Sequence, residues 1–254
     1  MFDQIEKSLI KIKKKYKLVA IKQSFEDEGV SRDVVNLIRN ITYKNKINHN
    51  IKIGGCEAKS DMNYCEEIQC DGIVAPMIET DFALKKFIQS SQNIKINSYY
   101  VNIETITAAK NIKSILLQDK KKILTGITIG RSDFTSSMGL SKKLVNSTEV
   151  FNEIYKVLKI AKSFKYRTTV GGNLSIESKK FINNLYKKNL IDNIESRNVC
   201  IKVDKNSLNN FEKTIQDMLM FEYELMNFIS IYHNKHMQTA DSRKTELENR
   251  FQKS

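Results

Sequence analysis

Charged side chains recur in this sequence directly after short apolar runs, as expected for functional residues held at strand ends. The clearest case is "ITIGRSDFTSSMGL" (127–140), where an apolar run ends at Gly130 and is followed by Arg131, Ser132 and Asp133. The charged residues found at such positions along the chain are Glu26, Asp27, Glu28, Lys52, Glu57, Glu79, Glu104, Arg131, Asp133, Glu195 and Arg197. Such a ring of charges is either the wall of a functional site or a set of ion pairs that orient loops.

Carboxylates dominate this set, and several of them in one place would repel each other unless a cation or a substrate neutralised them. Oxygen ligands without histidine or cysteine suit hard divalent ions such as Mg²⁺ or Mn²⁺. Glu104 and Asp133 follow consecutive apolar runs, so we expect them on adjacent strands as a pair of metal ligands. Lys52 or Arg131 could then hold the carboxylate of a substrate. The competing interpretation, strand-end ion pairs without a ligand, stays open.

The apolar runs themselves recur at a spacing that suits alternating strands and helices. Their polar end markers lie 24, 27, 25, 29, 38 and 24 residues apart, which is close to the roughly 30 residues of a strand–helix–strand crossover. Between the runs, "DFALKKFIQSSQ" and "VFNEIYKVLKIAKSF" repeat apolar residues three and four apart, as the buried face of a helix does. Alternating strands and helices form a parallel sheet.

Seven such runs occur, without the glycine fingerprint of a dinucleotide-binding sheet. This pattern favours an α/β fold of the (β/α)8 TIM-barrel type, in which the strand C-termini meet at one face and carry the active site. The eighth strand is expected to be irregular, missing or hidden near the N-terminus. Residues 204–254 are typical of one or two amphipathic helices, so we predict a catalytic barrel over 1–203 followed by a C-terminal helical extension.

The composition limits the class of protein. The chain has 254 residues, a hydrophobic content of 41% and one proline, Pro76, so it can form a full core and shows no obvious linker. Its net charge is +13, yet the basic residues are scattered and not interleaved with aromatic residues, so nucleic acid is not an expected partner. The four cysteines form no CxxC pair, and no apolar run reaches the ~20 residues of a membrane span. We expect a cytoplasmic protein without a membrane partner.

Three motifs in this chain resemble those of the HpcH/HpaI aldolase and citrate lyase beta-subunit family, within the phosphoenolpyruvate/pyruvate-binding TIM-barrel superfamily. The motifs are "PMIET" (76–80), "NIET" (102–105) and "IGRSDFTSSMGL" (129–140). The resemblance implies that Glu104 and Asp133 bind the divalent ion and that an α-keto acid such as pyruvate chelates it through its carboxylate and keto oxygens. The metal would stabilise the enolate formed when the adjacent carbon–carbon bond is made or broken.

Two departures from the family pattern bear on the reaction. Where the family usually carries an arginine, this sequence has Lys52, which offers a point charge in place of a bidentate fork. The catalytic histidine of the HpaI-type aldolases has no match, which leaves Glu26 or Glu28 as the hypothetical base. Lys52 and Arg131 complete the catalytic candidates. The candidate substrate-binding residues are Lys52, Glu79, Arg131 and Ser132.

The sequence thus predicts a metal-dependent carbon–carbon lyase of the pyruvate-aldolase class. A citrate-lyase-like enzyme acting on a CoA thioester is one alternative, and a non-catalytic barrel that binds polyanions is the other. Barrels of this superfamily often associate through C-terminal helices, so a homo-oligomer is expected, although a helix packed on its own barrel would show the same apolar stripe. The stripe consists of Leu219, Phe221, Leu225, Phe228, Ile229 and Tyr232.

Overall fold

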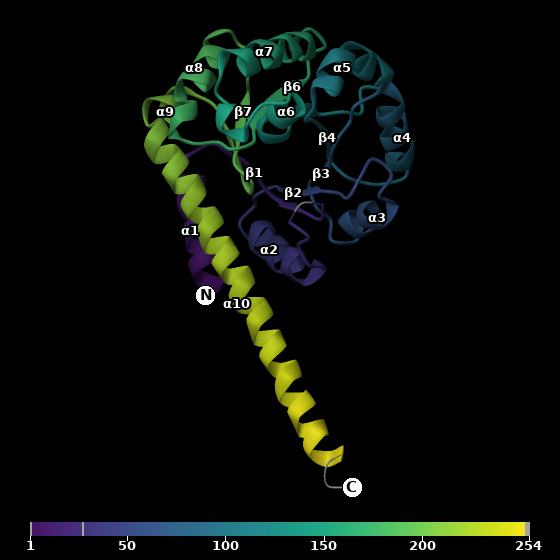
Figure 1. The fold of residues 1–254 in the computed structure, drawn as a ribbon, viewed down its shortest axis with the longest axis vertical. Coiled ribbons are helices and arrows are strands. Elements are labelled where there is room, and N and C mark those ends of the chain that lie inside the picture. Colours follow the sequence, from purple (N-terminus) through teal and green to yellow (C-terminus); the bar gives the residue numbers. More distant parts are fainter. Residues whose placement is uncertain (1, 27, 252–254) are drawn as a thin grey trace.

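The computed structural model describes residues 2–26 and 28–251, and within these ranges eight strands form a closed barrel (Figure 1). The strands are β1 (Leu18–Ser24), β2 (His49–Lys52), β3 (Gly72–Ala75), β4 (Ser98–Ile103), β5 (Gly126–Gly130), β6 (Arg167–Gly171), β7 (Asn193–Glu195) and β8 (Val199–Lys202). Each strand pairs with the next along the chain, and β8 closes the barrel against β1. The predicted α/β barrel is confirmed.

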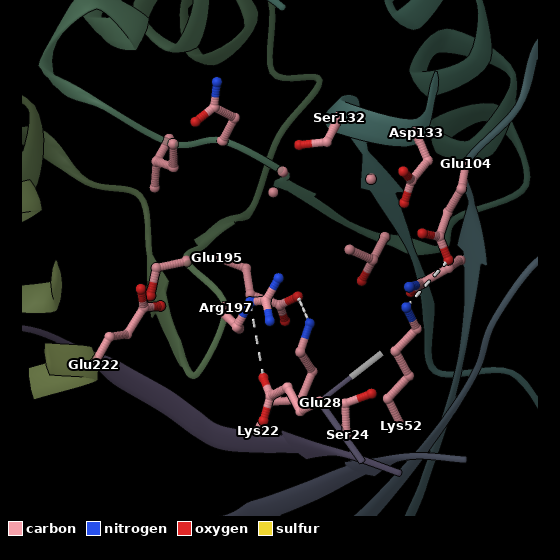
Figure 2. Close-up of a pocket in the computed structure, with 18 of the residues that line it drawn as sticks. Lys22, Ser24, Glu28, Lys52, Glu104, Ser132, Asp133, Glu195, Arg197 and Glu222 are labelled. Carbon is pink, nitrogen blue, oxygen red and sulfur yellow. Dashed lines mark hydrogen bonds and ion pairs between the residues drawn. The ribbon is translucent and has the colours of Figure 1, made fainter. Parts of the chain in front are cut away.

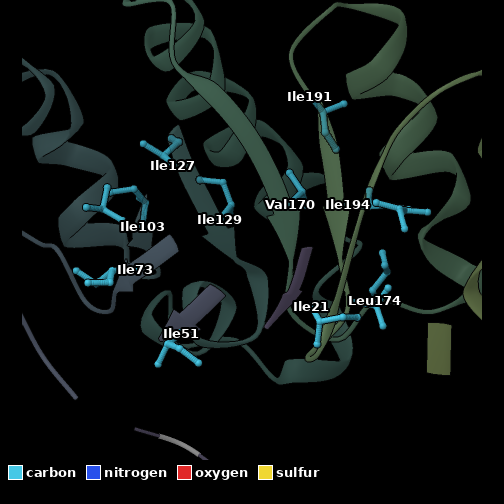
Figure 3. Close-up of a cluster of buried hydrophobic side chains, with 14 of the residues drawn as sticks. Ile21, Ile51, Ile73, Ile103, Ile127, Ile129, Val170, Leu174, Ile191 and Ile194 are labelled. Carbon is cyan, nitrogen blue, oxygen red and sulfur yellow. The ribbon is translucent and has the colours of Figure 1, made fainter. Parts of the chain in front are cut away.

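Side chains in several strands, such as β4 and β5, alternate between an apolar layer outside the barrel and a polar interior. In β5, Ile127 and Ile129 are fully buried in the hydrophobic core, whereas Thr128 between them lines a cavity. In β4, Asn102 lines the cavity, and the next residue, Ile103, is buried in the hydrophobic core. Because successive residues of a strand point to opposite faces, one run of sequence supplies both layers. Figure 3 shows the buried isoleucines of successive strands in one cluster.

The eighth strand is the irregular one. β1 to β7 run parallel, but β8 runs antiparallel to both of its neighbours, β7 and β1. Only residues 196–198 separate β7 from β8, which is long enough for a hairpin and far too short for a parallel crossover. The expectation that all strands end at one face therefore holds for β1 to β7 and is wrong for β8. As a consequence, the hairpin tip joins the rim where the parallel strands end.

Helices surround the barrel (Figure 1). They are α1 (Phe2–Lys15), α2 (Arg32–Lys44), α3 (Lys59–Glu67), α4 (Asp81–Ser91), α5 (Ile106–Gln118), α6 (Arg131–Ser137), α7 (Thr148–Ser163), α8 (Lys179–Lys187), α9 (Lys205–Asn209) and α10 (Phe211–Phe251), with short 3-10 helices at Lys142–Leu144 and Ile176–Ser178. Thr80 and Thr105, the last residues of "PMIET" and "NIET", are the N-caps of α4 and α5. The threonines of these motifs therefore end the strand-end loops and start the helices.

The C-terminal extension consists of α9 and the long helix α10. The first half of α10 packs against the barrel and lies beside α1, with Phe211, Phe221 and Leu225 buried. Its second half projects away from the barrel in Figure 1 and exposes Ile231 and Met237. Among the described residues, no helix combines the length and the apolar character that a membrane crossing requires.

Candidate active site

A polar cavity of about 680 Å³ opens at the face where the parallel strands end. Its wall consists of the inward positions of the strands, the loops that follow them and two residues of α10 (Figure 2). The lining side chains that matter for chemistry are Lys22, Glu28, Lys52, Asn102, Glu104, Ser132, Asp133, Lys142, Glu195, Arg197 and Glu222. Residues far apart in the chain meet here because successive strands of a closed barrel bring their carboxyl ends to one rim.

The two predicted metal ligands lie on the same side of this cavity. Glu104 directly follows β4, and Asp133 belongs to the first turn of α6 after the paired strand β5. Glu104 is 3% exposed, and burial raises the pKa of its carboxyl above the usual value, with the charge of Asp133 adding to the effect. Gly130 leaves room for this arrangement, because a Cβ there would lie 2.9 Å from Glu104 Oε2.

The oxygen atoms around Glu104 fit a hard divalent cation. Glu104 Oε1 and Asn102 Oδ1 are both buried without a hydrogen-bond partner, and Asp133 lines the same cavity. In the described part of the chain, no group of three or more His, Cys, Asp or Glu side chains gathers closely enough to hold a metal. A cation would therefore take two carboxylates and one amide from the protein and its remaining oxygens from substrate or water, as Mg²⁺ commonly does.

Two lysines reach the cavity from neighbouring strands. Lys52 Nζ lies 2.6 Å from Glu26 Oε2 and 3.8 Å from Glu104 Oε1, so its charge faces both carboxylates. Lys22 is largely buried, with 12% of its side chain exposed, and forms an ion pair with Glu195 on β7. Burial works against the charge of Lys22, but the carboxylate of Glu195 outweighs it and raises the pKa of Lys22 above its ordinary value. Lys22 is thus held as a cation.

Arg131 faces away from the cavity and does not belong to its wall. Its guanidinium donates to Gly171 O at 3.0 Å, to Asn146 Oδ1 at 2.8 Å and to Ser178 Oγ at 3.2 Å, and it lies 5.0 Å from the ring centre of Phe181. Burial lowers its pKa to about 10. The side chain therefore fastens the loop after β6 to the start of α6, which makes it a positioning residue and not the substrate-binding group that we expected.

Other predicted residues are also divided between the cavity and the surrounding loops. Ser132 and Glu28 line the cavity, whereas Glu26 is an exposed residue outside the lining and is the partner of Lys52. Glu79 accepts a hydrogen bond from Thr105 Oγ1 at 2.6 Å and does not reach the cavity. It supports the loop between β4 and α5 and is not placed to contact a substrate.

Glu57 and Asp27 also belong to the charged residues that follow the apolar runs. Glu57 pairs with Lys86 at 3.0 Å on the surface and does not line the cavity. Asp27 lies outside the described residues.

The sequence analysis missed several cavity residues, among them Lys22, Asn102, Lys142 and Glu222. Lys22 and Asn102 sit inside apolar runs, Lys22 four residues before Glu26 and Asn102 two residues before Glu104. Counting back along each strand in steps of two would have found both, because residues i and i+2 share a face. Glu222 comes from α10 and accepts a hydrogen bond from the backbone N–H of Asn198 at 2.9 Å. No local sequence pattern predicts that contact, because it depends on how α10 packs against the barrel.

A closed barrel with a polar site at the strand C-termini is the architecture of a TIM-barrel enzyme. A model of the HpcH/HpaI aldolase/citrate lyase family matches residues 26–171, which is more than half of the chain. The chain belongs to this family. No curated protein matches the sequence.

Solved structures with the same fold agree in architecture but have little sequence in common with this chain. An HpcH/HpaI aldolase from Desulfitobacterium hafniense superposes with a TM-score of 0.62 at 10% identity, over 86% of this chain and 89% of that one. An HpcH/HpaI aldolase/citrate lyase family protein from Burkholderia cenocepacia gives 0.61 at 12% identity, over 87% and 91%. A variant of the citrate synthase SbnG gives 0.61 at 10% identity, over 88% and 90%. At these identities the likeness concerns the fold.

Proposed function

We propose that this protein is a divalent-metal-dependent carbon–carbon lyase that makes or breaks a bond at the methyl carbon of a pyruvate-type α-keto acid. The observation that carries this proposal is the set of oxygen atoms around Glu104. Two of them, Glu104 Oε1 and Asn102 Oδ1, are buried without hydrogen-bond partners and lie with Asp133 at the end of two adjacent strands. The chain belongs to a family of aldolases and citrate lyases, and a metal site of this kind would serve the carbon–carbon bond chemistry of such enzymes.

The roles of the side chains follow from their positions. Glu104, Asp133 and Asn102 would hold Mg²⁺ or Mn²⁺, which supplies a Lewis acid that favours negative charge on the keto oxygen. Lys52, whose ammonium lies 3.8 Å from Glu104, would attract the carboxylate of the α-keto acid. Ser132 would donate a hydrogen bond to the bound acid. These groups bind and orient one substrate at one side of the cavity.

The bond-forming step also needs a proton carrier. The methyl carbon of the keto acid gives a proton to the base and attacks the carbonyl carbon of an aldehyde, and the protonated base then returns that proton to the aldehyde oxygen as the new carbon–carbon bond forms. Of the two candidate bases, Glu28 lines the cavity, with Asn198 Nδ2 at 3.2 Å from one carboxylate oxygen, whereas Glu26 is paired with Lys52. We therefore assign both proton transfers to Glu28.

A lyase acting on a CoA thioester is the second candidate, because the matching family includes citrate lyases as well as aldolases. It would use the same metal side of the cavity with a different partner molecule. The two candidates differ in the test with pyruvate, since only the aldolase requires pyruvate itself to lose a methyl proton.

The test is proton NMR of pyruvate in D₂O with purified protein and Mg²⁺ or Mn²⁺. We expect metal-dependent loss of the methyl signal that exceeds the exchange caused by metal alone. Asp133→Asn should abolish it. Lys156→Ala, which breaks an exposed ion pair with Glu153 on α7, is the matched control and should keep it. Metal binding without exchange would favour the thioester candidate, and absence of both would refute the proposed site.

A further inference from the structure

We propose that the half of the cavity opposite Glu104 binds an uncharged, polyhydroxylated aldehyde as the second substrate. This inference rests on the function proposed above and adds the chemical class of the partner molecule. The cavity measures about 680 Å³, which is far more than a three-carbon keto acid fills and lies within the range of sites for larger ligands. The unused space belongs to a separate group of side chains.

This second group lies on the side of β1, β7 and the hairpin. Figure 2 shows Lys22, Glu28, Glu195, Arg197 and Glu222 together, away from the metal-side residues. The reversal of β8 adds Arg197 to this group, since the tight turn from β7 to β8 lies at the rim. Glu222 reaches it from α10 by accepting from the hairpin backbone at 2.9 Å.

The charges of this group disfavour an anionic ligand. Three carboxylates face two cations, and each cation already has a carboxylate close by: Lys22 pairs with Glu195, and Arg197 Nε lies 4.0 Å from Glu28 Oε1. A phosphate or carboxylate on the ligand would meet Glu222 as a further negative charge and would have to displace an existing partner from a cation. An uncharged ligand has neither cost.

The wall is also unsuited to an apolar ligand. Among the described residues that line the cavity, the large apolar side chains are Leu174 and Leu219, and the rest of the wall is polar, charged or glycine. An alkyl or aromatic aldehyde would leave buried charged groups without water or a replacement partner, which costs free energy.

Hydroxyl groups can both donate hydrogen bonds to this wall and accept them from it. A hydroxyl can donate to Glu195 or Glu222 and at the same time accept from Lys22 or Arg197, because it is both donor and acceptor. Such hydrogen bonds to charged partners are stronger than those between neutral groups. Several hydroxyls on adjacent carbons would therefore replace the water of this half without removing any ion pair.

Matched aldehydes test the proposal. We would measure kcat/KM for aldol formation from pyruvate with D-glyceraldehyde, D-glyceraldehyde 3-phosphate and hexanal as acceptors. D-glyceraldehyde should exceed the phosphorylated form by about tenfold or more, from one unfavourable charge contact at short range. Glu222→Gln should narrow that ratio by about the same factor. Glu212→Gln, an exposed change of the same kind on α10, should leave the ratio unchanged.

A binding measurement makes the result independent of turnover. Saturation-transfer NMR on the protein with each aldehyde alone should give a stronger signal for D-glyceraldehyde, and Arg197→Ala should reduce it. If pyruvate does not exchange but this binding is seen, the aldolase proposal fails, and only the preference of this half of the cavity for an uncharged hydroxylated ligand stands. If pyruvate exchanges but D-glyceraldehyde 3-phosphate or hexanal is bound or used better, the inference is overturned and the aldolase proposal stands.

Discussion

Replacing Glu104 by glutamine separates the cost of burying this carboxylate from its value as a ligand. Glu104 is 3% exposed, its Oε1 atom has no hydrogen-bond partner, and the ammonium of Lys52 lies 3.8 Å from that atom. An unsatisfied buried polar atom costs about 1–3 kcal/mol, and a charged one costs more. Glu104→Gln keeps the shape and removes the charge, so in EDTA we expect the free energy of unfolding to rise by about 1–2 kcal/mol.

In EDTA we expect Glu104→Gln to be more stable than the wild type, and a divalent ion should make the wild type the more stable of the two. A ligand present at one hundred times its Kd stabilises the folded state by about 2.7 kcal/mol, which raises the Tm of a chain of this size by roughly 5–10 °C. Wild-type protein should show this rise on titration with Mn²⁺, and Glu104→Gln should not. Thermal unfolding in EDTA and in increasing Mn²⁺ measures both effects, with Lys156→Ala as the variant that follows the wild type.

Two results would refute the reasoning. If Glu104→Gln lowers Tm in EDTA, the attraction of Lys52 outweighs burial and Glu104 is an ordinary structural carboxylate. If the variant gains the same Tm shift with Mn²⁺ as the wild type, the ion binds elsewhere. Either result would leave the oxygen set around Glu104 without the role that we assign to it.

Three further predictions concern stability and assembly. Arg131→Met should lower the free energy of unfolding by about 3–5 kcal/mol in urea denaturation, because several buried acceptors lose a charged donor; a loss near zero would contradict the positioning role. Burial lowers the pKa of His49 to about 3, so below about pH 6.5 the unfolded chain binds a proton that the folded chain does not, and stability falls by up to ~1.4 kcal/mol per pH unit. His49→Gln should flatten that slope in equilibrium unfolding, and an unchanged slope would show that other groups cause it. Ile231→Lys with Met237→Lys, on the exposed part of α10, should reduce the proposed homo-oligomer to a monomer in light scattering, and a monomeric wild type would rule out that assembly.

The barrel could be predicted from the sequence because its causes are local. Ile127, Thr128 and Ile129 alternate in polarity, and this alternation already states which side chains face the helices and which face the interior. The spacing of the apolar runs then fixes the order of strands and helices. Glu104 and Asp133 could be paired for the same reason, since consecutive parallel strands become neighbours in a barrel.

The direction of individual side chains could not be predicted in this way. Arg131 and Asp133 are two residues apart, yet Asp133 lines the cavity and Arg131 is buried behind it. The difference arises because both residues belong to the first turn of α6, where residues two apart lie on different sides of the helix. A strand pattern extended past Gly130 would have put them on the same face.

The sequence by itself determined the apolar and polar layers, the strand order and the two carboxylates that end adjacent strands. Only the tertiary structure decided that β8 turns back, that Glu222 arrives from α10 and that Lys22 and Arg197 each meet a carboxylate. The physical reason is the distance along the chain over which each feature arises. Strand alternation and helix periodicity are properties of a few neighbouring residues. Charge pairing inside a cavity depends on segments that are distant in the chain and meet only when the barrel closes.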